Sequence, residues 1–395
     1  MATEPRIHTN HTYESSLAGV PVSGHPIAVE EFPDTLVEDT QKHPTTKPKK
    51  KLIRRTEKDN SQAIRRAFQF VFVAINVWVG VTFYLWTRYF ETGGTTRYVE
   101  RPAGVEGWLP IASLMNLKLL ALTGKIPEIH PAGMFLLIAF LAMSVLFKKA
   151  FCAWLCPVGT LAEYLWKLGR KLFKRNFHPW KWIDIPLRGL KYLLLGFFLY
   201  FISMMSAGAL EQFMGAPYAL IADVKMLNFF RYMTETAAIT IVVLVVLSML
   251  IQNFWCRYLC PYGALMGLAS LLSPVKIRRD AAACIDCAKC AKACPSHLPV
   301  DKLVKIQSAE CTACLECVAV CPAEGALAFA LPKMPLVADA KPKRVAPWVV
   351  AAAIAALFVG LVGGAKLTGH WNTDISKRAY MQLVPEANEA SHPGF

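Results

Sequence analysis

The sequence predicts an α-helical membrane protein with about five transmembrane helices and a small α+β domain. Three observations predict this fold class. Of the 395 residues, 54% are hydrophobic, which is more than a soluble domain of this size carries. The apolar residues are gathered in blocks, and eight of the twelve cysteines fall in a compact motif that occurs twice in the C-terminal third.

Five apolar stretches each approach the ~20 residues that a helix needs to cross about 30 Å of hydrocarbon. They cover residues 67–87, 132–147, 189–210, 236–255 and 346–365. The second stretch is short unless it also includes Pro131 and part of the segment after Phe147. We therefore expect five spans, the first four of which belong to a membrane domain at residues 65–275.

The net charge of +15 comes from lysines and arginines that crowd the ends of the apolar stretches. They are dense before the first stretch and between the second and third, and sparse in the alternate loops. By the positive-inside rule, the N-terminus is cytoplasmic and the C-terminus periplasmic, in a bacterial inner membrane. A nucleic-acid groove would need a basic face instead, so we expect membrane lipid and no nucleic acid as a partner.

Eight cysteines form two copies of C-x2-C-x2-C-x3-C-P. In the bacterial two-cluster ferredoxin run, three such thiolates hold one [4Fe–4S] cubane and the fourth reaches the other cubane. Zinc sites rarely use this spacing, and disulfides do not suit the reducing cytoplasm where the topology places the segment. We predict an α+β two-cluster bacterial ferredoxin domain at residues 276–340. We assign one cluster to Cys284, Cys287, Cys290 and Cys321, and the other to Cys311, Cys314, Cys317 and Cys294.

The remaining four cysteines form a second repeated motif, C-x3-C-P-x-G. Each copy follows an even-numbered span, which places both copies at the cytoplasmic face of the membrane. If the segment is helical, a pair spaced i, i+4 points both thiols to one side. The two pairs then meet as a third site for a metal, a cluster or a redox dithiol; the alternative is that they are packing cysteines beside a helix stop. The residues are Cys152, Cys156, Cys256 and Cys260.

The two motifs end a longer internal repeat of span, outer loop, span and C-x3-C-P. Each outer loop holds a shorter apolar stretch, residues 109–122 and 213–230, which we interpret as interfacial or re-entrant helices. Two such halves pack around a pseudo-two-fold axis along the membrane normal, which brings the thiol pairs together. Residues 1–64 are expected to be a disordered basic tail, residues 346–365 the fifth span and residues 366–395 a short periplasmic tail.

At this point the sequence resembles the membrane polyferredoxins exemplified by NapH, a subunit of periplasmic nitrate respiration, and by the C-terminal half of the nitrous oxide reduction factor NosR. The resemblance covers roughly residues 65–370 and rests on the cluster motifs, the two C-x3-C-P motifs and the run R-P-A-G-V-E-G-W-L-P at residues 101–110. It implies quinol-linked electron delivery to an extracytoplasmic reductase. The chain differs from NosR in having no N-terminal flavin domain, and from NapH in its long basic tail and fifth span.

The leading functional hypothesis is an iron–sulfur electron-transfer subunit that passes electrons between the quinol pool and a periplasmic or membrane-bound redox partner. A quinol site needs an apolar slot and a polar group that accepts a proton. The outer loops supply candidates for that group, of which Glu106 and His130 lead because they flank the 109–122 stretch. The full set is Glu106, Glu128, His130, Glu211 and Asp223.

Two alternatives remain open. A weaker resemblance to CcoG implies metal-centre assembly or metal reduction, although the sequence has no Met-rich or His-rich copper tract. The other alternative is an electron wire without quinone chemistry, between a cytoplasmic donor and a membrane partner. Covalent c-type haem is excluded because the sequence contains no C-x-x-C-H, and no nucleotide motif is present.

Overall fold

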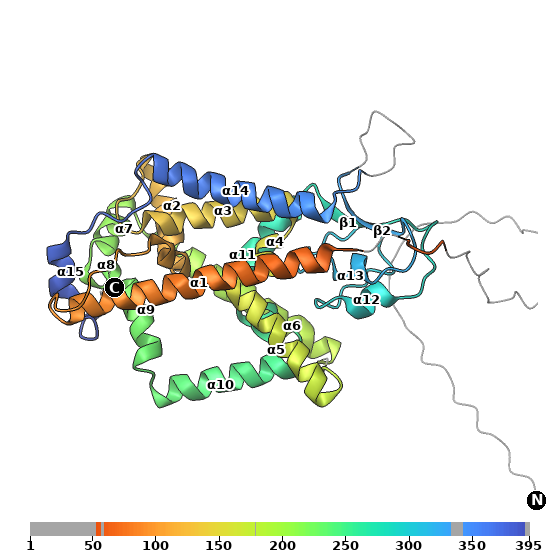
Figure 1. Cartoon of the computed structure of the whole chain (residues 1–395), viewed down its shortest axis with the longest axis horizontal. Coiled ribbons are helices and arrows are strands. Elements are labelled where there is room, and N and C mark those ends of the chain that lie inside the picture. Colours follow the sequence, from red (N-terminus) through yellow and green to blue (C-terminus); the bar gives the residue numbers. More distant parts are fainter. Residues whose placement is uncertain (1–52, 57–58, 178, 333–342, 392–395) are drawn as a thin grey trace, which may run out of the picture. The chain divides into compact units, whose positions relative to one another are not determined.

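The computed structural model describes residues 53–56, 59–177, 179–332 and 343–391 (Figure 1). Most of the predicted basic tail, the segment 333–342 and the last four residues lie outside this description. The described chain is mostly helical and contains one two-stranded sheet. The predicted class, a helical chain with a small α+β part, is therefore confirmed in outline.

All five predicted apolar stretches form helices, but their lengths differ. Three helices are long and apolar enough to cross a membrane by themselves. A fourth candidate is the pair of α9 and α10, which is bent by 82° at a short break. The remaining stretch forms α3, which has 17 residues. The helices are α1 (Ser61–Glu91), α3 (Pro131–Phe147), α6 (Lys181–Met204), α9 (Ala222–Arg231), α10 (Glu235–Leu250) and α14 (Pro347–Leu367).

The helix ends differ from the predicted bounds for local reasons. Helix α6 begins eight residues earlier than predicted and ends at Met204, after which Ser206 caps a new helix through a hydrogen bond from the Ala209 N–H. Helix α10 ends at Leu250 because the next residue, Ile251, pairs with Phe177 in a β-bridge. The short outer stretches also form helices, as expected. The stretch 109–122 forms α2 (Pro110–Thr123), preceded by the 3-10 helix η1 (Ala103–Trp108), and the stretch 213–230 forms α8 (Pro217–Leu220) and α9. Helix α7 (Ala207–Met214) covers the end of the third apolar stretch.

Helices α1, α3 and α14 pack side by side. Phe358 of α14 lies edge-on to Phe72 of α1, with ring centroids 5.2 Å apart, and parallel to Phe140 of α3 at 6.5 Å. Helix α10 packs on α5 (Pro157–Phe173), where Gly169 permits close approach because an added Cβ would lie 1.9 Å from the Met249 carbonyl oxygen.

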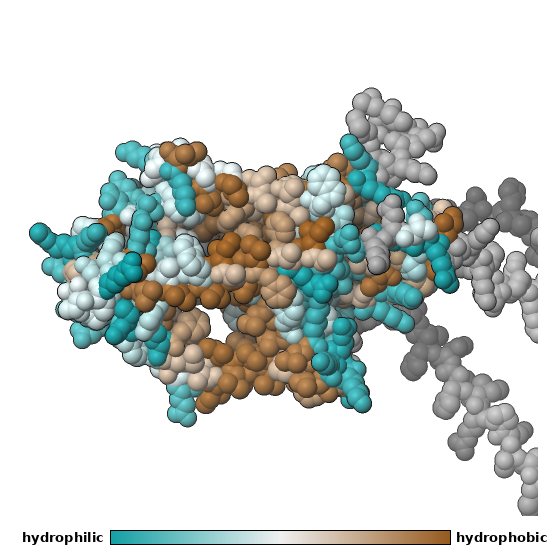
Figure 2. All heavy atoms as spheres, in the orientation of Figure 1, coloured by the Kyte–Doolittle hydropathy of each residue, from teal (hydrophilic) through white to brown (hydrophobic). Residues whose placement is uncertain are grey.

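The surface of the middle of the molecule is apolar. Large side chains along the long helices are exposed, and Figure 2 shows brown surface over these helices with teal concentrated toward the two ends. A continuous apolar belt of this kind indicates contact with lipid. The protein is therefore a membrane protein. Members of the belt include Trp78, Val81, Phe197, Val242 and Val359.

The cysteine-rich segment lies at one end of the long helices. Strands β1 (Lys276–Arg279) and β2 (Leu327–Ala330) pair antiparallel, with Lys276 opposite Ala330. The cysteine loops lie between them and contain the short helices α12 (Lys289–Ala293) and α13 (Glu316–Ala319). At the start of α1, the Gln62 amide donates to the Cys314 carbonyl at 2.9 Å. At the other end of α1, Trp86 packs on Tyr380 of α15 (Lys377–Leu383). The cysteine-rich segment and α15 thus lie at opposite ends of α1.

The two C-x3-C-P motifs form the turns that follow α3 and α10. The first lies in α4 (Ala150–Trp154) and the start of α5. The second lies in a π-helical turn, η2 (Trp255–Leu259), which leads into α11 (Pro261–Ala269) and the 3-10 turn η3 (Ser270–Leu272). Because α3 runs opposite to α1 and ends beside these turns, the motifs share the side of the molecule that carries the cysteine-rich segment.

Candidate functional site

The two ferredoxin loops have the same backbone conformation. Asp286 and Ala288, which flank Cys287, have φ of 54° and 55°, and the equivalent residues Ala313 and Leu315 have φ of 50° and 60°. A left-handed residue other than glycine costs roughly 1–2 kcal/mol. Alternating helical signs curl the chain into a concave nest of backbone N–H groups, which is a known setting for iron–sulfur sites. The loop geometry therefore fits an anionic cluster bound by thiolates.

Thiols from the two copies of the motif lie near one another, and the crosswise ligand sets stay a prediction. Burial raises the pKa of Cys321, and the nearby thiols of Cys287 and Cys284 raise it further. Cys294 instead lies near Cys311, which raises its pKa after burial. The members of this second set also line one small cavity: Cys294, Cys311, Cys314 and Cys317.

No three His, Cys, Asp or Glu side chains among the described residues are close enough to share one metal ion. A cubane makes a different demand, because each of its four thiolates binds a different iron atom.

The C-x3-C-P motifs fold into matching helix caps. Cys156 is the N-cap of α5 and accepts a hydrogen bond from the Gly159 N–H at 3.4 Å, and Cys260 caps α11 and accepts from Gly263 at 3.2 Å. The proline after each cysteine takes the first helical position, where its missing N–H is not needed. Glycine is required at position 159, since an added Cβ would lie 2.2 Å from the Cys152 carbonyl oxygen. The motif thus sets a sulfur at each helix N-terminus.

The four thiols of the two motifs converge. Burial raises the pKa of Cys256 well above its ordinary value, and Cys260, Cys156 and Cys152 raise it further. Two of these thiols come from each repeat half. All four thiols line one cavity, and their use as a single site stays a prediction.

One cavity of about 970 Å³ connects this quartet of thiols to the opposite side of the molecule. Its lining on α1 extends from Arg65 to Thr82, which corresponds to roughly 26 Å of helix. One end is lined by the quartet and by Cys314 of the ferredoxin loop, and the other by Arg101 and its neighbours. Aromatic and aliphatic side chains line the middle, among them Phe72, Phe140, Phe151, Phe358 and Val362.

Glu106 and His130 do come together, but inside a buried ion network. Glu106 Oε1 lies 3.3 Å from His130 Nδ1 and accepts a hydrogen bond from Arg101 Nη1 at 2.8 Å. Arg101 Nη2 also donates to Asp223 Oδ2 at 2.6 Å. The other two candidates, Glu128 and Glu211, are exposed and lie outside this network.

The carboxyl group of Glu106 in this network is ionised at neutral pH. Burial alone would raise the pKa of Glu106, but Arg101 and then His130 lower it below its ordinary value. Burial alone would lower the pKa of His130, but Glu106 and Asp223 raise it. Arg101 lines the cavity, whereas Glu106 and His130 contact Arg101 or each other without lining the cavity. The sequence did not single out Arg101 as a site residue, although it lies in the 101–110 run.

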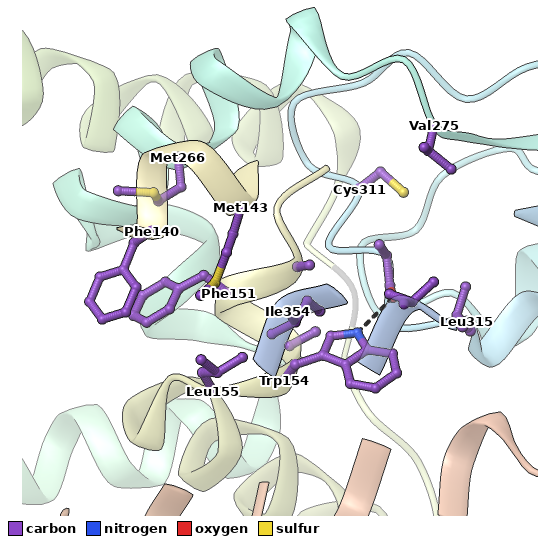
Figure 3. Packing of buried hydrophobic residues seen from close by; sticks show 14 of the residues in the cluster. Phe140, Met143, Phe151, Trp154, Leu155, Met266, Val275, Cys311, Leu315 and Ile354 are labelled. Carbon is purple, nitrogen blue, oxygen red and sulfur yellow. Dashed lines mark hydrogen bonds between the residues drawn. The ribbon is translucent and has the colours of Figure 1, made fainter. Parts of the chain in front are cut away.

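Two further residues escaped sequence reasoning. Lys149 is buried beside the quartet, with its Nζ 3.6 Å from the position of a Cβ on Gly263. Trp154, inside the first C-x3-C, donates its indole N–H to the Ala313 carbonyl of the ferredoxin loop at 3.1 Å (Figure 3). The sequence signal for Lys149 was hidden among the many lysines that orient the chain in the membrane.

Comparison with known proteins matches this division of the chain. The family described as a 4Fe-4S binding domain matches residues 129–176 and 235–280, the two C-x3-C-P repeats, and the 4Fe-4S dicluster domain matches residues 276–322. A candidate electron transport protein of Escherichia coli K12, YccM, is 48% identical over 333 residues, which cover 84% of this chain and 93% of YccM. The chain belongs to the membrane polyferredoxin family of the NapH and NosR type. No solved structure matches it at a significant level.

Other polyferredoxins align with smaller parts of the chain. NosR of Pseudomonas aeruginosa is 32% identical over 166 residues, which cover 41% of this chain and 22% of NosR. NapH of Haemophilus influenzae is 29% identical over 159 residues, which cover 40% of this chain and 51% of NapH. The polyferredoxin is thus a membrane iron–sulfur protein of an electron-transport family.

Proposed function

We propose that this polyferredoxin transfers electrons between the quinol pool and a periplasmic or membrane-bound respiratory partner. The observation that supports this proposal is the apolar cavity, whose volume suits a small-molecule ligand and which borders both the thiol quartet and Cys314. A quinol releases two electrons and two protons on oxidation, so its ring must lie close to a redox group. The descriptions of two relatives support electron transfer, since YccM is described as a candidate electron transport protein and NapH as a ferredoxin-type protein.

The proposed electron carriers are two [4Fe–4S] clusters in the ferredoxin domain. The first is bound by Cys284, Cys287, Cys290 and Cys321, and the second by Cys311, Cys314, Cys317 and Cys294. These clusters would supply one-electron chemistry. The chain's own contribution is the strained nest of each loop and the apolar cover over the second set, which includes Ile277, Leu298 and Leu315.

Five spans are proposed, with the N-terminus in the cytoplasm and the C-terminus in the periplasm. Under this proposal α3 and α10 count as spans and α9 belongs to the outer loop, which keeps the division into a membrane domain at 65–275, a ferredoxin domain at 276–340 and a fifth span at 346–365. The contacts at the two ends of α1 support this topology. The ferredoxin domain contacts one end of α1 and α15 contacts the other, so the two lie on opposite sides of the membrane if α1 crosses it. The basic residues at the ferredoxin side favour the cytoplasm there.

The orientation predicts the behaviour of reporter fusions. Alkaline phosphatase fused after residue 391 should be active, and a fluorescent protein that fails to mature when exported should be dark at the same position. Fusions after residue 332 should show the reverse pattern, because this point belongs to the ferredoxin domain. A fluorescent, phosphatase-inactive fusion at residue 391 would mean that the number of spans is even.

Filling the cavity should block quinone chemistry. Val362 of α14 lines the cavity, whereas Val359, three residues earlier, is 66% exposed on the outer surface. We expect Val362→Trp to weaken binding of a short-chain quinone about tenfold or more, equivalent to about 1.4 kcal/mol. Titration calorimetry on anaerobically purified protein measures the affinity, and bleaching of the visible cluster absorbance by the quinol measures the reaction.

Val359→Trp is the matched control, since it adds the same side chain to the same helix outside the cavity. Both variants should retain the iron content of the wild type. Equal quinone affinity in the two variants would show that quinone does not bind in this cavity. A wild-type protein that neither binds quinone nor is reduced by quinol would contradict the proposed function. It would favour the alternative of an electron wire without quinone chemistry.

A further inference from the structure

The fold gathers four thiols that the ferredoxin domain does not use. They come in pairs from the two repeat halves, and each pair ends at the N-terminus of a helix, α5 or α11. We propose that this quartet, Cys152, Cys156, Cys256 and Cys260, binds a third [4Fe–4S] cluster, with Lys149 as its buried counter-charge. The proposal goes beyond the proposed function, which requires only the two ferredoxin clusters.

The helix caps favour thiolates. A cysteine sulfur at a helix N-terminus accepts backbone N–H bonds and lies at the positive end of the helix dipole, which stabilises the thiolate that binds iron. Both Cys156 and Cys260 have this arrangement, through Gly159 and Gly263. Neither half can supply four ligands alone, so a cubane requires both halves and the pseudo-symmetry that brings them together.

Lys149 supplies positive charge where an anionic cluster would need it. The residue is 3% exposed, and an isolated ammonium at such a depth is costly. Its Nζ lies 3.6 Å from the position of a Cβ on Gly263, the residue whose N–H donates to Cys260. Lys149 also lines the cavity together with all four thiols of the quartet.

The adjacent lysine serves a different site. Lys148 has φ of 61°, which turns the chain between the two side chains. Its Nζ donates to the Ser308 carbonyl at 3.2 Å, three residues before Cys311 of the second ferredoxin set. Lys148 therefore carries its charge to the ferredoxin loop, whereas Lys149 lines the cavity together with the quartet.

The first C-x3-C segment is in direct contact with the ferredoxin domain through Trp154. Figure 3 shows the Trp154 indole directed at the loop that carries Cys311 and Leu315, where it donates to the Ala313 carbonyl at 3.1 Å. Trp154 itself lies between Cys152 and Cys156. A cluster held by the quartet would therefore border both the second ferredoxin loop and the cavity proposed for quinone, which Cys314 also lines.

The alternatives for the quartet are zinc, disulfides and simple packing. All twelve cysteines are unbridged in the structure. A zinc ion would need four sulfurs that each lie about 2.3 Å from the metal. Among the described residues, no three cysteine side chains lie close enough together to bind one ion in this way. The match of both repeats to a 4Fe-4S binding domain favours the cluster.

The first test is the metal content of the whole protein, purified anaerobically. We expect about twelve irons and about twelve acid-labile sulfides per chain, in place of about eight. The double variant Cys152→Ala, Cys256→Ala should lose about a third of the iron and retain the ferredoxin signals in paramagnetic resonance. Cys287→Ala is the control, because it should remove a ferredoxin cluster and leave the quartet signal. Eight irons in the wild type, or zinc that disappears in the double variant, would overturn the proposal.

The second test needs no loss of a ligand. In a redox titration followed by paramagnetic resonance, Lys149→Met should shift the reduction of the quartet cluster to lower potential, because removing a nearby positive charge disfavours the added electron. Lys148→Met should instead shift a ferredoxin cluster. Both substitutions keep the side-chain length. The assignment of Lys149 would be contradicted if both variants shifted the potential of the same signal equally, or if Lys149→Met shifted the potential of none of the three signals.

Discussion

The double variant Cys294→Ala, Cys317→Ala is expected to lose no more iron than either single variant. Cys294 follows the first three cysteines of its own motif, yet its thiol lies near Cys311, and Cys314 and Cys317 both have Cys294 as a neighbour. If one cluster uses Cys294 and Cys317 together, the first substitution already releases it. Each single variant should lose about four irons per chain.

The matched partner experiment combines Cys294→Ala with Cys287→Ala. These two residues belong to the same motif but to different proposed clusters, so their iron losses should add to about eight per chain. Alanine is preferred over serine because a serine oxygen can still bind iron. Iron analysis and paramagnetic resonance of the reduced protein give the two readouts. The reverse pattern, with additive loss for Cys294 and Cys317, would mean that each motif binds its own cluster.

Much of the architecture could be predicted because it depends on local sequence. The apolar stretches form helices wherever composition allows, and the x2 spacings of the cysteines fix loops that curl around one centre. The ends were less predictable. Helix α3 starts at Pro131 after His130 and ends at Phe147 before Lys148, and both flanking residues have a positive φ that the sequence does not signal.

The site was only partly predictable because its other residues meet through long-range contacts. Arg101 and Asp223 are 122 positions apart, and nothing near either residue indicates the other. The motif predicts that Cys156 and Cys260 end a helix turn, but not that their sulfurs cap the next helices. Trp154 has the composition of a core residue, and its role at the boundary with the ferredoxin domain depends on a single indole hydrogen bond.

The buried network at the other end of the cavity should be a major contributor to stability. Arg101 is 9% exposed and pairs with two carboxylates that are fully buried, Glu106 and Asp223. Its replacement leaves these two carboxylates without their shared guanidinium, and the imidazole of His130 stays 3.3 Å from Glu106. Breaking a buried ion pair by removing one partner costs about 3–5 kcal/mol. We therefore expect Arg101→Met to lower the melting temperature of the detergent-solubilised protein by far more than a surface substitution does.

Arg97→Met tests this expectation, because Arg97 lies four residues earlier in the same loop and is exposed. Its effect on thermal unfolding should be within about 0.5 kcal/mol of the wild type. Adding Asp223→Asn to Arg101→Met should restore part of the lost stability, since it removes one of the unpaired charges. If the stability were lost only because the aliphatic stem of Arg101 no longer packs, Asp223→Asn would restore none of it. That result would mean that packing, and not charge, is the main contribution of Arg101 to stability.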